Sequence, residues 1–217
     1  MSGVTRLCLC AALAASAAWA QDPAARLVER AREDREIVYF LNAPETHSFD
    51  LHHDYTESGE GIDKYLNVVR KGSTVSNPSA RVLDTGEKLR VETLRGDAIT
   101  RAGIDVKSEV PGGVTSDTEV VVVRFTPVAK GSSVRLRIAE TYTDTARYGL
   151  QGEDLVFDRS LGRPRNAVVL PAGWYLTACS IPAAVSETAD GRIRLDFVNP
   201  RPDEIDVLLR ARRRPGR

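Results

Sequence analysis

The sequence predicts an all-β protein, an antiparallel two-sheet β-sandwich of immunoglobulin-like or larger size. From residue 36 onward, apolar residues recur at every second position, which is the period of a strand with one buried face. Gly, Pro and Asp turn signals separate these runs at short intervals. No stretch after residue 35 has a clear helical period, which argues against alternating strands and helices.

Residues 1–20 have the pattern of a signal peptide. Arg6 provides a positive start, residues 7–15 are apolar, and small residues at Ala18 and Ala20 suit cleavage before Gln21. A membrane anchor is the alternative, but the apolar run is shorter than the roughly 20 residues that span a bilayer. We therefore expect a periplasmic or secreted protein with no transmembrane segment after signal cleavage.

Residues 21–35 allow two interpretations. Asp22 and Pro23 are typical of the first positions of a helix, and Leu27, Val28 and Ala31 would share one helical face. The segment is also short and charged, which suits an N-terminal extension without regular structure. Both alternatives stay open at this point.

The β-sandwich domain is expected to span residues 36–213. Alternation is strongest in 134–139, 192–197 and 205–212, whereas 119–125 is apolar on both faces and predicts a central strand. Further strands are predicted at 36–42, 47–57, 63–70, 79–84, 87–94, 104–110, 153–158, 165–170 and 173–179.

Two segments are polar. Residues 143–152 are expected to form a crossover or a boundary between two lobes, although the absence of internal repeats favours one large sandwich. The basic end at 214–217 belongs to a stretch with five Arg among residues 210–217. We expect a solvated end there, with contact to anionic lipid or a polyanion as the alternative.

Composition and motifs exclude several functions. The chain has 30 basic and 30 acidic residues, so it lacks the positive excess of nucleic-acid-binding proteins, and no nucleic acid is expected as a partner. It contains no His-Glu-x-x-His, Gly-x-Ser-x-Gly, Walker or Cys-x-x-Cys motif. Whether the chain is an enzyme stays open, and the sequence favours a protein without catalytic activity.

All three histidines fall within residues 47–53. Strand alternation places Asp50, His52 and Asp54 on one polar face, whereas His53 faces the core. We expect an ordinary solvated face and no cofactor there; the alternative is a binding stripe of these three residues, with Asp50 and His52 as ligands of a divalent cation. Alternate strand positions lie about 6.6 Å apart, so all three side chains cannot converge on one ion.

Adjacent aromatic residues give a second candidate binding site. Alternation points one of Trp174 and Tyr175 into the core and leaves the other to stack on a sugar ring or to anchor a protein. Cys179, the one cysteine left after signal cleavage, lies in the same run and is expected to be a buried small side chain.

These observations favour an exported, non-catalytic β-sandwich protein that acts as a binding or interaction module in the cell envelope. Its expected partner is an envelope protein or a polysaccharide. One alternative is a metal-assisted hydrolase that uses Asp50 and His52 with residues from another strand. The other is a purely structural envelope protein, which would show no pocket.

Overall fold

The computed structural model describes residues 35–107, 110, 112–201 and 203–215. The predicted signal peptide, and the 21–35 segment except for its last residue, lie outside the described residues. The described part contains fourteen strands: β1 (Glu36–Leu41), β2 (Ser48–Glu57), β3 (Lys64–Val68), β4 (Thr74–Val82), β5 (Arg90–Arg95), β6 (Glu119–Arg124), β7 (Val134–Thr143), β8 (Tyr148–Gln151), β9 (Asp154–Leu161), β10 (Arg165–Val169), β11 (Trp174–Cys179), β12 (Ala184–Glu187), β13 (Ile193–Val198) and β14 (Ile205–Arg213).

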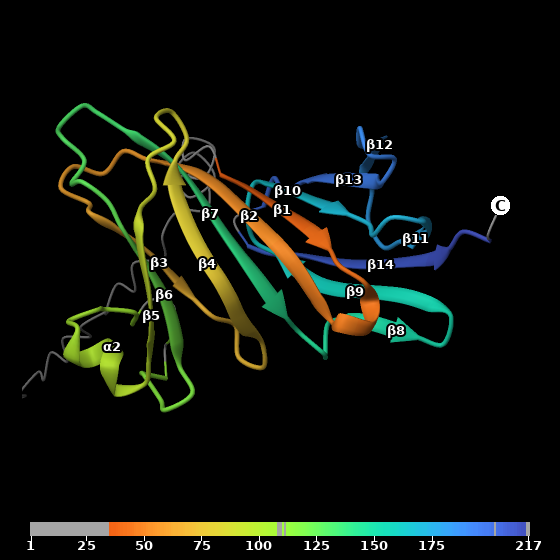
Figure 1. Ribbon diagram of the computed structural model, residues 1–217, viewed down its shortest axis with the longest axis horizontal. Coiled ribbons are helices and arrows are strands. Elements are labelled where there is room, and N and C mark those ends of the chain that lie inside the picture. Colours follow the sequence, from red (N-terminus) through yellow and green to blue (C-terminus); the bar gives the residue numbers. More distant parts are fainter. Residues whose placement is uncertain (1–34, 108–109, 111, 202, 216–217) are drawn as a thin grey trace, which may run out of the picture.

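Seven of these strands form one large sheet in the order β12-β13-β10-β1-β2-β7-β4. Neighbouring strands in it are antiparallel except for β1 and β10, which pair in parallel. A four-stranded sheet has the order β11-β14-β9-β8, and a three-stranded sheet has the order β3-β6-β5. Figure 1 shows the two small sheets at opposite ends of the molecule, with β2 and β7 running between them.

Both small sheets cover the same face of the large sheet, which we call its inner face. Phe49 of β2 shares one core with Phe157 of β9 and Leu209 of β14, whereas Tyr55 of β2 shares another with Val123 of β6. The all-β sandwich prediction is therefore confirmed, with a second layer that is divided into two separate sheets.

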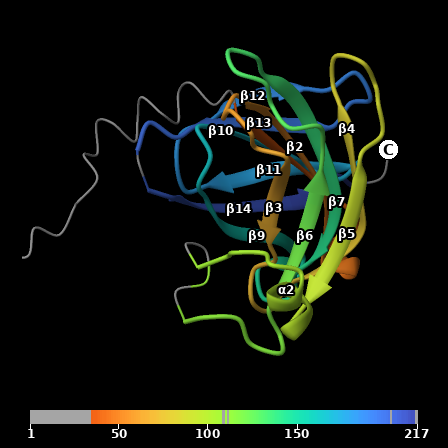
Figure 2. The same cartoon turned by 90° about the vertical axis from the view of Figure 1, so that its left-hand side faces the viewer.

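Strand β6 is buried on both sides, as the sequence predicted for a central strand. Val121 and Val123 face the large sheet, whereas Val120 and Val122 pack under Ile99 and the chain that follows it. Ile99 belongs to the short helix α2 (Asp97–Arg101), which stands in front of the three-stranded sheet in Figure 2. This third layer explains the absence of alternation in the β6 sequence.

The predicted strand at 104–110 is wrong for residues 104–107 and 110, which form turns and loop. Ile104 and Val106 are buried against the outer side of β6, so their alternation reflects a loop that is packed on a sheet. Residues 108 and 109 lie outside the described part of the chain.

The polar segment 143–152 carries the chain from the large sheet to the four-stranded sheet, as a crossover does, and it also contains a strand that the sequence did not predict. Tyr148–Gln151 forms β8, which pairs with β9 as a hairpin at the edge of the four-stranded sheet. Gly149 lies so close to His47 that a Cβ atom there would approach the imidazole Nδ1 to 2.6 Å. The close approach requires glycine and removes the strand signal from this segment.

Two further elements differ from the sequence prediction. Strand β4 begins at Thr74 and contains a bulge between Ser76 and Ser79, where Asn77 has a φ of 53°. Strand β12 is exposed at every position and therefore carries no alternation to detect. The helices α2 and η1 (Pro44–Thr46) are too short for a helical period, and no helix in the described residues has the length and apolar character needed to span a membrane.

Candidate functional site

A cavity opens on the inner face where the two small sheets leave part of the large sheet uncovered. We call it the inter-sheet cavity. It has a volume of about 750 Å³ and lies between β3 on one side and the end of β9 on the other. Its floor is formed by inward-facing side chains of β1, β2 and β7, among them Ile37, Tyr39, Leu51, His53 and Glu140. The fold therefore brings polar residues from three separate parts of the chain to one place.

Strand register determines how the two ionisable groups of the floor, His53 and Glu140, lie relative to each other. In the β2–β7 pair, His53 lies opposite Ile138 and Leu51 lies opposite Glu140, so His53 and Glu140 are diagonal neighbours on the inner face. Each is only 3% exposed. An imidazole and a carboxyl group are thus buried on an otherwise apolar surface.

Glu140 has a partner for one of its two carboxyl oxygens. Asn67 on β3 donates to Oε2 at 2.7 Å and to the Tyr142 hydroxyl at 2.9 Å. Oε1 has no hydrogen-bond partner among the described residues. Burial raises the pKa of Glu140 to about 7, and the Asn67 hydrogen bond offsets this effect only in part.

Only one of the two ring nitrogens of His53 has a hydrogen-bond partner among the described residues. The Tyr65 hydroxyl lies 3.0 Å from Nδ1, whereas Nε2 has no partner within the described part of the chain. Burial lowers the pKa of His53 well below its ordinary value, and the positive charges of Arg163 and Arg35 lower it further. His53 is therefore neutral at neutral pH.

Arg159 on β9 forms a buried part of the cavity wall. Its Nη1 donates to the Asp144 carboxylate at 3.1 Å, and its guanidinium lies 5.1 to 5.8 Å from the ring centres of Tyr39, Phe49 and Tyr142. These contacts fix the cation in place and neutralise it. Arg159 therefore stabilises the wall, and its positive charge is already balanced by the Asp144 carboxylate before any ligand binds.

Side chains at the mouth of the cavity are mostly paired as well. Arg70 lies 3.6 Å from Glu204, and Asp203 accepts two hydrogen bonds of 2.7 Å from Arg201. Arg163 is half-buried and forms no ion pair with a carboxylate in the part of the chain that the structure describes. The mouth therefore carries an uncompensated guanidinium above the buried floor.

The predicted stripe of Asp50, His52 and Asp54 lies on the opposite face of the large sheet, which we call its outer face. Thr141 donates to Asp50 at 2.7 Å, and Arg137 donates twice to Asp54 at 2.6 and 2.7 Å. His52 does not contact either carboxylate in a hydrogen bond within the described residues.

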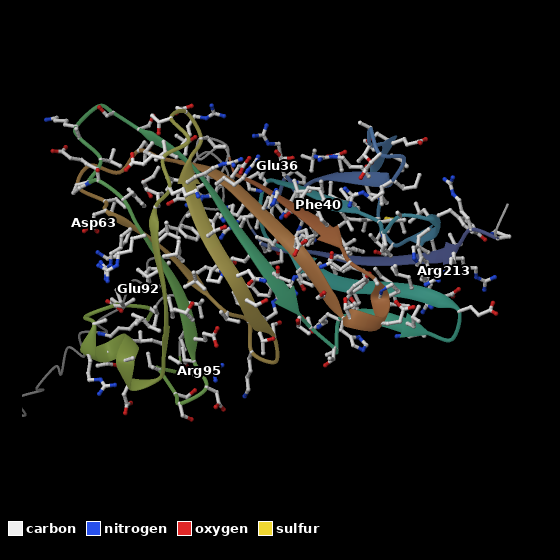
Figure 3. All side chains as sticks on the ribbon, viewed as in Figure 1. Glu36, Phe40, Asp63, Glu92, Arg95 and Arg213 are labelled. Atoms are coloured by element: carbon white, nitrogen blue, oxygen red, sulfur yellow. The ribbon has the colours of Figure 1, made fainter. Side chains whose placement is uncertain are left out.

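The His52 ring packs edge-on against Phe40 of β1 with 5.0 Å between ring centres, and Figure 3 labels Phe40 on the same strand as Glu36. Burial lowers the pKa of His52, with Arg137 as the next cause. Within the described residues, no group of three or more His, Cys, Asp or Glu side chains is arranged to hold a metal ion. Among the described residues, no third His, Cys, Asp or Glu side chain therefore lies where it could bind a metal ion together with Asp50 and His52.

Trp174 and Tyr175 point in opposite directions, as strand alternation predicts. Trp174 is buried with the Arg213 guanidinium 5.3 Å from its ring centre, whereas Tyr175 is 37% exposed. Neither residue lines the inter-sheet cavity. Cys179 packs against the core but is only half-buried, so the expectation of a buried side chain holds in part; its thiol donates to the Ile181 carbonyl at 2.9 Å.

Sequence reasoning did not select Glu140 or Arg163. A signal for Glu140 is present, because Leu136, Ile138, Glu140 and Tyr142 continue one period-two series in which only Glu140 is charged. A charged residue at an inward position of a strand indicates a special environment. No comparable local signal marks Arg163, which lies in a loop after β9.

No family model and no curated protein matches the sequence. Among solved structures, the M1 zinc metallopeptidase from Deinococcus radiodurans has a TM-score of 0.43 and 13% identity, covering 82% of this chain and 41% of that one. An aminopeptidase N family protein from Idiomarina loihiensis has a TM-score of 0.43 and 10% identity, covering 81% of this chain and 29% of that one. A putative protease from Parabacteroides distasonis has a TM-score of 0.42 and 13% identity, covering 82% and 39%. The chain spans less than half the length of each, and no activity is transferred to it from them.

Proposed function

We propose that the chain is an exported, non-catalytic binding module of the cell envelope and that its ligand site is the inter-sheet cavity. The observation that supports this proposal is a pair of buried polar atoms on the cavity floor, His53 Nε2 and Glu140 Oε1, which have no hydrogen-bond partner among the described residues. Unpaired buried polar groups are rare because each costs roughly 1–3 kcal/mol of stability. Their retention beside a cavity is typical of a functional site.

The cavity has the size of a small-molecule site. Its volume of about 750 Å³ falls inside the range of roughly 300–1,000 Å³ that ligand pockets occupy. Its lining includes hydroxyl, amide and charged groups besides apolar ones, which suits a polar ligand. One sugar unit of a polysaccharide or a polar side chain of an envelope protein would fit this description.

The pairing of the ionisable groups favours binding over catalysis. His53 Nε2 and Glu140 Oε1 are closed to water, so the surrounding side chains must move before a ligand or a reacting atom can contact either one. Arg159, the buried cation of the wall, is already held by Asp144. Among the described residues of the lining, the Tyr65 hydroxyl lies beside a buried imidazole and the Ser160 hydroxyl donates to Asp206.

Export rests on the pattern of residues 1–20, with its charged start, apolar run and small-residue cleavage site. Fractionation of the source cells, with N-terminal sequencing of the recovered protein, tests this part of the proposal. A mature chain that begins at Gln21 in the periplasm or medium supports it. Recovery of the chain in the cytosol with residues 1–20 intact contradicts it.

The binding proposal is tested by two-dimensional NMR of the purified protein against a panel of neutral, acidic and basic monosaccharides. We expect at least one sugar to shift the amide signals of Tyr65 and Asn67, and the Asn67→Ala variant to weaken that binding. Asn42→Ala, which removes a side-chain amide outside the cavity, is the matched control and should bind as the unaltered protein does. Shifts confined to the outer face around Asp50 and His52, or no shifts with any sugar, would contradict the proposal.

A further inference from the structure

We infer that the ligand of the inter-sheet cavity carries a small oxyanion, a carboxylate or a phosphate, which is held by the Arg163 guanidinium. This inference rests on the proposed function, because it assigns a ligand chemistry to the same cavity. It follows from the distribution of charge around the cavity and from the position of Arg163.

Internal pairing leaves the cavity with an excess of positive charge at its mouth. The wall cation Arg159 is neutralised by Asp144, and Arg70 is offset by Glu204. Arg163 alone, of these three arginines, forms no ion pair with a carboxylate in the described residues. Arg35 also lines the cavity, so an incoming ligand experiences the positive field of Arg163 together with that of Arg35.

The remaining acidic group of the lining does not oppose an anion strongly. Glu140 is buried on the floor and closed to water at its free oxygen, so it is set back from the mouth. Its pKa of about 7 means that about half of the molecules carry it in the neutral form at neutral pH. Asp203, the other carboxylate nearby, is already bound by both nitrogens of the Arg201 fork.

Arg163 is half-buried in the lining of the cavity, and its charge acts on the floor. It lines the cavity between Gly162 and Pro164, at the end of the loop that leaves β9. Its positive charge is near enough to oppose the burial-driven rise in the pKa of Tyr39 and of Tyr65, and to lower that of His53. These three side chains come from β1, β3 and β2, so the charge of Arg163 acts on both the large sheet and the three-stranded sheet.

The chemistry of a half-buried guanidinium selects an oxyanion. Its planar fork donates two parallel hydrogen bonds to a carboxylate or phosphate, and such charge-assisted bonds are stronger than neutral ones. Partial removal from water strengthens the interaction further. A neutral sugar gains much less from this group, and a cationic ligand is repelled by it.

A series of hexoses that differ in one substituent distinguishes an anionic ligand from a neutral and a cationic one. We would titrate the purified protein with glucuronate, glucose 6-phosphate, glucose and glucosamine, and follow the amide signals of Tyr65 and Asn67 by NMR. We expect one or both of the anionic sugars to bind at least tenfold more tightly than glucose, and glucosamine to bind more weakly than glucose. The two anionic probes distinguish a carboxylate from a phosphate site.

Three variants assign the effect to Arg163. Arg163→Gln should weaken binding of the preferred anion about tenfold, and Arg163→Lys, which keeps the charge but not the fork, should give an intermediate loss. Arg212→Gln is the matched control, because Arg212 is an exposed arginine that is bound to Asp154 on the four-stranded sheet. It should leave binding unchanged, and spectra of all three variants outside the cavity report that the fold is intact.

The outcomes separate this inference from the proposal on which it rests. If glucose binds as tightly as the anions and Arg163→Gln has no effect, the oxyanion inference is overturned and the cavity remains a ligand site. If no hexose shifts the cavity signals, both are overturned. Anion binding that responds equally to Arg163→Gln and Arg212→Gln would also overturn the inference, since it would reflect net charge alone.

Discussion

The two faces of strands β2 and β7 carry similar polar residues in opposite situations. On the outer face, Thr141 donates to Asp50 and Arg137 donates twice to Asp54. On the inner face, His53 and Glu140 each retain a buried atom without a partner among the described residues. Adjacent positions of the same strands thus differ in whether their polar groups are satisfied. A polar stripe in a sequence marks a surface, whereas an unsatisfied polar group in the core marks a candidate site.

Burial makes the inner face energetically sensitive. Water cannot screen charges there. When one partner of a buried ion pair is removed, the other remains as an unpaired buried charge, and its full desolvation cost lowers the stability of the fold. When an ion pair on the outer face is broken, water hydrates the remaining charge, so the free energy of unfolding changes little. The following variants break or sharpen this contrast.

The largest effect is expected from Asp144→Asn, which removes the carboxylate that neutralises buried Arg159. Side-chain exposures of 7% for Arg159 and 4% for Asp144 leave the guanidinium without solvent compensation. We expect a loss of about 3–5 kcal/mol in the free energy of unfolding, measured by urea denaturation. Asp84→Asn breaks the exposed pair with Arg135 and should cost below about 1 kcal/mol. Equal losses in the two variants would refute the contrast.

Glu140→Gln tests the buried carboxyl group through pH. The pKa of Glu140 rises from 4.5 in the unfolded chain to about 7 in the folded one, so the folded state binds the proton more tightly. Stability from this group is complete below pH 4.5 and is lost as the pH rises toward 7. The free energy of unfolding of the Gln variant, taken relative to that of the unaltered protein, should therefore rise by about 3 kcal/mol between pH 4 and pH 8.

His53 has the opposite linkage, because its lowered pKa makes the folded protein gain stability as the pH rises to about 6.5. Both proteins in the comparison retain His53, so its contribution cancels in the difference. Urea denaturation at a series of pH values measures this difference for Glu140→Gln. A difference that is independent of pH would show that Glu140 titrates normally.

Asp54→Asn should have a smaller effect on the outer face. Asp54 and Arg137 have side-chain exposures of 26% and 31%, so water replaces much of the lost interaction. We expect a loss of about 0.5–1 kcal/mol that shrinks as salt is added. Thermal melting at low and high salt measures it. A loss as large as that of Asp144→Asn would place the outer pair in the same class as the buried one.

The smallest effect is expected from divalent cations at Asp50 and His52. A site occupied at 100 times its dissociation constant would add about 2.7 kcal/mol to stability. We expect no change in melting temperature with Ca²⁺, Mg²⁺ or Zn²⁺ beyond that of the Asp50→Ala/His52→Ala variant. A shift of several degrees with one metal that the variant abolishes would restore the metal-assisted hydrolase as a candidate.

The sequence was informative about the fold wherever one strand face is buried. Strands such as β7 and β14 alternate because they cover a core, and β6 is apolar throughout because it is covered on both sides. Strands β8 and β12 escaped notice for different reasons. Gly149, which the close approach of His47 requires, interrupts the pattern of the four-residue strand β8, and every residue of β12 is exposed.

The candidate site was harder to predict than the fold. Asp50, His52 and Asp54 are conspicuous in the sequence because they are close together, yet they face solvent. The cavity instead combines Glu140 with Asn67 and Arg163, whose proximity depends on how three sheets pack. Alternation indicates which way a side chain points, but it does not indicate which distant strand lies above it.

The most direct test of this account is an NMR titration of the Glu140 carboxyl group in uniformly ¹³C-labelled protein, with the signal assigned by Glu140→Gln. We expect an apparent pKa of about 7, because burial raises the pKa of Glu140 and the Asn67 hydrogen bond offsets this effect only in part. The addition of ligand to the cavity should then change this value. A pKa near 4.5 would show that Glu140 is solvated or paired in solution, and it would contradict the contrast between the two faces on which the proposed site depends.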